Sequence, residues 1–364
     1  MGSRRRACVA FVIASICLSG PRLCAQAEHD QHDAANGPDQ RSSLLLRAFG
    51  AVEWAGSQQE ETPNSFGLGQ FALFATSNLH ERVSVLAEVV LEASGNNTRV
   101  VTDLERLQIT FRLRDFLNLS AGRYHTGIGY YNAAFHHGAY FETPIDRPRV
   151  FAFEDEGGVL PVHEVGMTAS GIVPGTGSTL RYLAEVGNGR SFDRAARGET
   201  DEERRDRNGA KSTNLGLSFR PSGSGGLELG ASYYRDTVPQ NAAADVNLRI
   251  GAAFAVYRTP SIELMAEWLR LQHRIDGGPS FANNAGYLQG SRAWGQWRPY
   301  YRYDRLAIDP ATPFIGSAGS YRSNIVGIRF DPMQWVGLKA QYEHTDEPRQ
   351  RGVDAVRAQL VFVF

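Results

Sequence analysis

The histidines and carboxylates of this chain are the side chains that could do chemistry, and none of them completes a known catalytic motif. His80-Glu81 and His163-Glu164 lack the second histidine of the H-E-x-x-H zinc-protease motif, and neither G-x-S-x-G nor a phosphate-binding P-loop occurs. His136 and His137 are neighbours, so in an extended loop their rings point apart and do not complete a tetrahedral metal site. We therefore expect no enzymatic activity, no metal and no cofactor.

Composition and the N-terminal residues restrict the class of protein. The chain has 38 Lys and Arg against 39 Asp and Glu, a formal net charge of −1, which offers no basic excess for a nucleic-acid partner. An apolar run at 7–18 follows three arginines and is closed by Ala25-Gln26-Ala27, which is typical of a secretory signal peptide. We expect residues 1–27 to be a cleaved signal peptide that contains all 3 cysteines, and residues 28–41 to be a disordered periplasmic lead. His29 and His32 in this lead leave a weak divalent-metal site as the alternative to a solvated segment.

From Ser42 onward, apolar and polar residues alternate with the period of a β-strand. In residues 83–91 the side chains of Val83, Val85 and Val89 share one face, while Glu88 lies on the other. Taking each such stretch as a strand predicts about sixteen strands, an even number within the range of closed outer-membrane barrels. The predicted strands cover 42–55, 66–77, 83–93, 104–113, 117–125, 164–173, 179–187, 213–220, 227–235, 247–257, 262–271, 285–294, 298–306, 322–330, 335–345 and 354–364.

Three further features favour a transmembrane barrel over a soluble β-sandwich. Connections after even-numbered strands are short and those after odd-numbered strands are longer and more polar, as in periplasmic turns and extracellular loops. The 5 tryptophans lie near predicted strand ends, where aromatic girdles meet lipid headgroups. The last strand alternates up to Phe364, an ending that resembles the strand read by the barrel assembly machinery in bacterial outer-membrane proteins. We expect residues 42–364 to form one all-β, antiparallel transmembrane β-barrel.

The charged residues on the faces opposite to the apolar ones define an expected pore wall. A barrel of about sixteen strands leaves a lumen too wide for side chains to fill, so we expect water inside it. Ten basic and nine acidic residues are expected to face inward, a near balance that predicts no strong ion selectivity. For any single residue, pairing with a neighbour across the strands is the alternative. The wall residues that we single out from this set are Arg106, Arg112, Arg181, Arg249, Arg302, Arg329, Lys339, Glu88, Glu267 and Asp304.

The longest connection runs from about Thr126 to His163, after the fifth predicted strand. Its aromatic content is too high for a freely solvated loop, and connections of this length are usually functional or disordered. The charged residues that we single out in it are Asp146, Arg147, Arg149, Glu154, Asp155 and Glu156.

Short motifs along the chain resemble the phosphate-selective porin O and P family. They are Ala121-Gly122-Arg123-Tyr124-His125-Thr126-Gly127-Ile128-Gly129, Val186-Gly187-Asn188-Gly189 and Arg298-Pro299-Tyr300-Tyr301-Arg302-Tyr303-Asp304. The resemblance spans most of the barrel and implies a porin whose third extracellular loop folds inward and narrows the channel. It implies that the long connection is this constriction loop, with Asp146, Glu154, Asp155 and Glu156 facing wall arginines, and it suggests a homotrimer. The chain departs from that family's lysine-lined anion path, because its only lysines are Lys211 and Lys339.

Together these features predict a passive diffusion channel for small hydrophilic solutes or ions in a Gram-negative outer membrane, in contact with lipid. A substrate-selective channel for phosphate or another anion is the first alternative. A barrel hydrolase is the second; it needs a serine or aspartate beside a histidine at the outer rim, and His125 is the nearest candidate.

Overall fold

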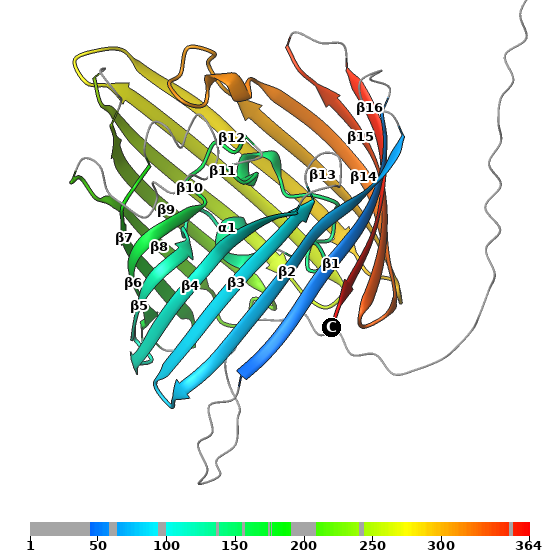
Figure 1. Cartoon of the computed structure of the whole chain (residues 1–364), viewed down its shortest axis with the longest axis horizontal. Coiled ribbons are helices and arrows are strands. Elements are labelled where there is room, and N and C mark those ends of the chain that lie inside the picture. The colour runs from blue at the N-terminus through cyan, green and yellow to red at the C-terminus, as the bar shows by residue number, and fades with distance from the viewer. Residues whose placement is uncertain are drawn as a thin grey trace, which may run out of the picture. The chain divides into compact units, whose positions relative to one another are not determined.

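A computed structural model describes residues 44–57, 64–93, 100–135, 138–154, 157–173, 175, 177–190, 209–239, 244–348 and 352–364. In these residues the chain forms a closed antiparallel barrel in which each strand pairs with its neighbours in sequence (Figure 1). The strands are β1 (Leu44–Ser57), β2 (Ser65–His80), β3 (Val83–Ala93), β4 (Val100–Arg114), β5 (Leu117–His125), β6 (His163–Val173), β7 (Thr179–Gly187), β8 (Ser212–Arg220), β9 (Leu227–Val238), β10 (Val246–Arg258), β11 (Ile262–Ile275), β12 (Ser280–Arg292), β13 (Trp297–Ala307), β14 (Tyr321–Met333), β15 (Val336–Asp346) and β16 (Val353–Val363).

The predicted fold class is confirmed, and every predicted strand is present. The ranges 83–93, 117–125 and 179–187 match β3, β5 and β7 at both ends. The largest difference is at β12, which begins at Ser280 instead of residue 285. The predicted signal peptide (1–27) and lead (28–41) lie outside the described residues.

The barrel closes where β1 pairs with β16, from Phe49 opposite Val363 to Ser57 opposite Ala355. Two further backbone hydrogen bonds extend this seam: the Ala48 amide donates to the Phe364 carbonyl at 2.8 Å, and the Phe364 amide donates to the Ala48 carbonyl at 3.0 Å. The C-terminal residue is therefore part of the closure. A closed ring leaves no strand edge unpaired, which is the condition for β-structure in hydrocarbon.

The two faces of the barrel wall differ in polarity. Large apolar side chains on the outer face are exposed, among them Leu107, Met167, Leu217, Leu288 and Val326. Charged and amide side chains on the inner face are buried, among them Glu88, Arg106, Glu267, Arg302 and Gln341. This arrangement is the reverse of a soluble protein and is typical of a transmembrane barrel. No helix in the described part of the chain has the length and apolar character needed to cross a membrane.

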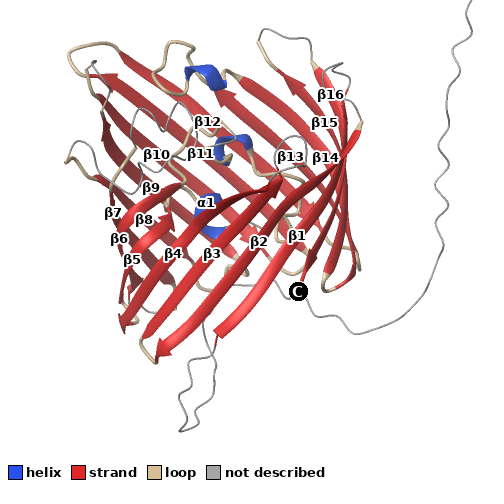
Figure 2. Ribbon diagram, in the orientation of Figure 1, coloured by secondary structure: helices blue, strands red, loops and turns tan. Residues whose placement is uncertain are grey.

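The segment between β5 and β6, residues 126–162, is hereafter called the inner loop. It contains α1 (Tyr131–Ala134) and η1 (Arg149–Phe151), which lie within the ring of strands (Figure 2), whereas η3 (Gly316–Ala318) lies between β13 and β14. The main hydrophobic core forms between the inner loop and the inner face of β9–β13. Its members include Tyr131, Phe151, Leu160, Leu248, Ile250, Leu269 and Leu271.

The polarity of the outer face predicts a position-dependent cost of charge. Leu288 of β12 is 57 % exposed on the apolar outer face. Ala282 lies on the same face, nearer the start of β12, at the end of the barrel that carries the connections after odd-numbered strands (hereafter the long-loop end). In lipid vesicles we expect Leu288→Arg to lower the free energy of unfolding by about 2–4 kcal/mol and Ala282→Arg by about 0–1 kcal/mol. Denaturant titration followed by tryptophan fluorescence measures both, and equal effects would contradict a lipid-facing position for Leu288.

Candidate functional site

The interior of the barrel is the candidate site, and the inner loop enters it through a glycine-rich turn. The Gly127 amide donates to Glu185 Oε2 of β7 at 2.9 Å, and the Gly129 amide donates to Ser232 Oγ of β9 at 3.0 Å. Gly129 has φ of +74°, and a Cβ there would lie 2.4 Å from Glu267 Oε2. Only glycine combines this conformation with so close an approach to the wall, so the chain can turn inward here.

Glu267 of β11, an expected wall residue, binds the start of α1. Its Oε2 accepts the Tyr130 amide at 2.6 Å, and its Oε1 accepts the Tyr131 amide at 2.8 Å. The Tyr287 hydroxyl of β12 also donates to Oε1, at 2.8 Å. The carboxylate is 4 % exposed, so these three donors replace water. Glu267 therefore holds the inner loop against β11 instead of facing open solvent.

Three expected wall cations bind backbone carbonyls of the inner loop farther along. Arg302 donates to the carbonyls of Asp146 at 2.8 Å and Arg147 at 3.3 Å. Arg329 donates to the carbonyls of Tyr140 at 2.6 Å and Glu142 at 2.9 Å. Lys339 donates to the carbonyls of Ala139 at 2.5 Å and Pro144 at 3.0 Å. β13, β14 and β15 thus anchor residues 139–147 through charge-assisted hydrogen bonds.

The far end of the inner loop reaches the seam of the barrel. Asp146 forms an ion pair with Arg357 of β16, and the rings of Phe141 and Phe49 of β1 lie 5.0 Å apart between centroids. Tyr140 packs against the small apolar cluster of Phe49, Ala72 and Val90 on β1–β3. The inner loop therefore contacts the wall from β7 round to β3.

The remaining expected wall residues, apart from Arg249, occupy three kinds of position. Arg106 and Glu88 form a buried ion pair, with 2.6 Å between Nε and Oε2, and Asp304 pairs with Arg302 at 3.1 Å. Arg112 donates to Asn78 Oδ1 at 2.8 Å, and Arg181 is half-buried on β7.

Arg249 lies on the outer face, so the expectation that it lines the lumen does not hold. It is exposed between Leu248 and Ile250, which are buried against the inner loop. The physical reason is that the inner face of β10 is apolar where the inner loop packs on it, which inverts the usual polarity of the strand.

The charged residues of the inner loop mostly serve its own structure. Arg147 donates to the Phe151 carbonyl at 2.7 Å and lies 4.2 Å from the Phe153 ring centroid, while Arg149 lies 5.7 Å from the Tyr321 ring. Asp146 forms an ion pair with Arg357 of β16, whereas Glu154 accepts the Val162 amide at 2.6 Å. Asp155 and Glu156, like His136 and His137, lie outside the described residues.

Tyr131 is a buried donor within the inner loop. Its hydroxyl donates to Glu142 Oε1 at 2.9 Å, and its ring stacks on Phe135 and Phe151 with centroids 4.5 and 5.6 Å away. Burial and the nearby Glu142 carboxylate raise the pKa of Tyr131 well above its usual value. The hydroxyl therefore keeps its proton, and the loop keeps this hydrogen bond, throughout the neutral pH range.

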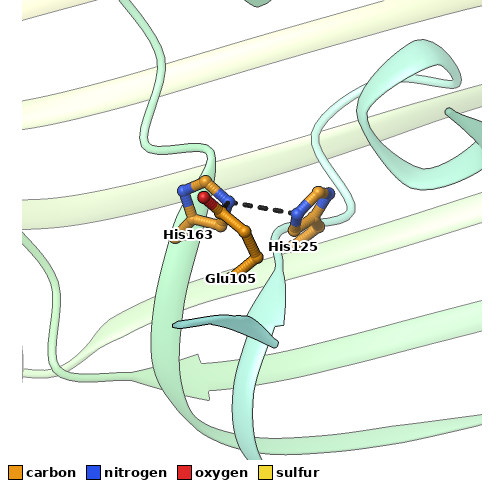
Figure 3. Close-up of side chains that lie close together, drawn as sticks. All are labelled: Glu105, His125 and His163. Carbon is orange, nitrogen blue, oxygen red and sulfur yellow. Dashed lines mark hydrogen bonds and ion pairs between the residues drawn. The ribbon is translucent and has the colours of Figure 1, made fainter. Parts of the chain in front are cut away.

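One buried cluster was not foreseen in the sequence. His125 at the end of β5 and His163 at the start of β6 face each other beside Glu105 of β4 (Figure 3). His125 is 8 % exposed, so it does not lie at an open outer rim as the hydrolase alternative requires. The signal available in the sequence was only that a histidine stands at each end of the longest connection.

Comparison with known proteins gives the fold. Neither a protein-family model nor a curated protein sequence matches the chain. Among solved structures, an anion-selective porin from Comamonas acidovorans is similar with a TM-score of 0.61 and 11 % identity, covering 89 % of this chain and 100 % of that one. OmpF of Salmonella typhi, in a complex with daunomycin, has a TM-score of 0.61 and 10 % identity over 89 % and 98 %. The trimer form of OmpT, an outer membrane protein of Vibrio cholerae, has a TM-score of 0.55 and 11 % identity over 89 % and 99 %. The chain therefore has a porin-like barrel fold.

Removing a cation that binds the inner loop should loosen that loop. Lys339→Met removes two hydrogen bonds from a charged donor, each contributing about 1.5–3 kcal/mol. We expect amide hydrogen exchange in residues 138–147 to accelerate at least about 10-fold, while β-strand amides stay protected. Arg112→Met, which removes an inner-face cation bonded to Asn78, is the matched control and should leave these amides unchanged. The same rates in Lys339→Met and the parent would show that Lys339 is not an anchor.

Proposed function

We propose that this chain is a passive diffusion channel in the outer membrane of a Gram-negative bacterium. The observation that carries the proposal is a closed barrel with an apolar outer face, a polar inner face and a long loop bound inside. Sixteen strands enclose more space than side chains fill, and partly exposed polar side chains remain on the inner face. Gln70, Thr110, Arg112 and Arg181 are examples on β2, β4 and β7. Solutes would cross down their gradient through this space, without turnover or cofactor.

The membrane location is supported by the outer face. Tyr233, Trp268 and Tyr301 are about half exposed there, on β9, β11 and β13, and outward-facing arginines lie closer to the long-loop ends of these strands. Aromatic residues at headgroup level, with cations beyond them, are typical of a membrane-spanning barrel. The signal-peptide pattern and the alternation ending at Phe364 agree with export and recognition by the barrel assembly machinery. The trimer form of the Vibrio cholerae protein supports a homotrimer for this chain.

The inner loop would narrow the passage. It contacts the inner face of β7–β16 and β1–β3 through wall side chains, so it fills part of the lumen, while partly exposed polar side chains remain on β2, β4 and β7. Deleting residues 133–155 should therefore admit larger solutes. We expect proteoliposomes with the deletion variant to swell in sugars that the parent excludes, at equal amounts of heat-modifiable, folded protein. Identical size limits in the two proteins would contradict a constricting role.

Weak ion selectivity is proposed because most inner cations already bind a carboxylate or the backbone of the inner loop. Arg106 and Arg302 pair with carboxylates, and Arg329 and Lys339 bind loop carbonyls. A phosphate-selective channel, as the resemblance to the porin O and P family suggests, would need a row of accessible cations. The anion-selective porin among the similar structures keeps this alternative open to test.

Reversal potentials distinguish the two cases. Across a tenfold KCl gradient we expect a value near zero, against about 59 mV for ideal selectivity, and no block by phosphate. Converting both Arg112 and Arg181 to Glu should shift the potential toward cation selectivity, because both lie on the inner face. Arg249→Glu is the matched control on the outer face and should leave the potential unchanged. An anion-directed potential abolished by low phosphate would support the selective channel instead.

A further inference from the structure

A β-bulge in β4 turns two consecutive charged residues toward the interior. The register with β3 runs from Glu88 opposite Arg106 directly to Val89 opposite Leu104, so Glu105 is the extra residue of the bulge. Glu105 and Arg106 are 4 % and 5 % exposed. A bulge of this kind commonly re-aims a side chain at a functional position. Here it places the Glu105 carboxylate beside the two ends of the inner loop, where the loop leaves β5 and returns to β6.

One histidine lies at each end of the inner loop. His125 is the last residue of β5 and His163 is the first of β6, and the two are register partners. Their Nε2 atoms lie 3.0 Å apart, and Glu105 Oε2 lies 2.6 Å from His163 Nε2 (Figure 3). All three side chains are more than nine-tenths buried. Two imidazole nitrogens and one carboxylate oxygen thus converge on one point from three adjacent strands.

A fourth residue orients this set. Glu154 Oε2 lies 3.2 Å from His163 Nδ1, while its Oε1 accepts the backbone amides of Val162 and His163 at 2.6 and 3.2 Å. The ring of Phe153 stacks on His163 with centroids 5.7 Å apart. A carboxylate bonded to Nδ1 orients the imidazole ring so that Nε2 points at the cluster. This carboxylate–histidine arrangement is usual around protein-bound metals.

We propose that Glu105, His125 and His163 bind one divalent transition-metal ion, with zinc the best match. Two histidines and one glutamate are a known zinc donor set, and tetrahedral bonds of about 2.0–2.1 Å place ligand atoms about 3.3 Å apart. The observed separations of 2.6 and 3.0 Å need to widen only by about 0.3–0.7 Å to reach that spacing.

The proposed ion would fasten both ends of the inner loop to the wall. It joins β4, β5 and β6, and residues 126–162 leave and return at its two histidine ligands. Its role is structural, and it does not depend on the proposed channel function.

Zinc content of the folded protein tests the site. The mature chain is refolded in detergent with His29→Asn and His32→Asn, which remove the N-terminal histidine pair, then stripped with a chelator, dialysed against Zn²⁺ and desalted. We expect one zinc per chain by elemental analysis and, after Co²⁺ exchange, the intense visible absorption of tetrahedral cobalt. Zinc binding should also slow hydrogen exchange in 120–127 and 160–166.

Variants assign the ligands. Glu105→Gln, His125→Asn and His163→Asn should each weaken zinc binding at least about 100-fold, and Glu154→Gln about 10–100-fold. His273→Asn is the matched control, because His273 is a fully buried histidine elsewhere on the inner face, and it should keep one zinc. Heat-modifiable mobility verifies folding of each variant; if His163→Asn does not fold, Glu105→Gln and the cobalt spectrum decide. A folded parent that retains less than a tenth of a zinc per chain overturns the proposal, as does zinc binding by Glu105→Gln and His125→Asn that is as tight as in the parent.

Discussion

Closure of the backbone hydrogen bonds around sixteen strands is the constraint on which the rest of the structure depends. A strand edge in hydrocarbon would leave amides and carbonyls without partners, so the ring must close, and β1 pairs with β16 up to the carboxyl-terminal residue. The same closure produces an interior that wall side chains cannot fill. Residues 126–162 occupy part of it, and their aromatic residues form the main hydrophobic core with β9–β13. The hydrophobic core of this protein therefore lies inside the barrel, against β9–β13, and the apolar residues of the outer face are not part of it.

The inner loop brings buried backbone groups into the lumen, and the charged residues of the wall satisfy them. Glu267 accepts two amides at the start of α1, while Arg302, Arg329 and Lys339 each donate to two carbonyls. Burying a charge or a backbone polar group without a hydrogen-bond partner costs free energy. The wall charges and the loop backbone therefore satisfy each other. This exchange explains why charges that look like a pore lining act largely as anchors. It also leaves fewer cations for an ion path, in agreement with the weak selectivity proposed above.

Local sequence patterns predicted the barrel well, because apolar outward-facing and polar inward-facing residues alternate along most of the strands. The predicted ranges of β5 and β7 matched at both ends. The range predicted for β12 began five residues too late, because Ser280 and Asn284 make the outer face of this strand polar near its start. Alternation could not place Arg249, because Leu248 and Ile250 are apolar on the inner face, where the inner loop packs. The cluster of Glu105, His125 and His163 needed a bulge, a strand register and a loop that returns to its origin. None of these is visible in a window of sequence, so the absence of a metal motif was not informative about this site.

The central claim is that the barrel encloses a continuous aqueous passage beside the inner loop. Single-channel recording of the refolded mature chain in a planar lipid bilayer tests it most directly, with heat-denatured protein as the control for detergent artefacts. The account predicts discrete, reproducible current steps that scale with the salt concentration. Silence from protein shown to be folded and inserted would contradict it, because the inner loop would then seal the barrel.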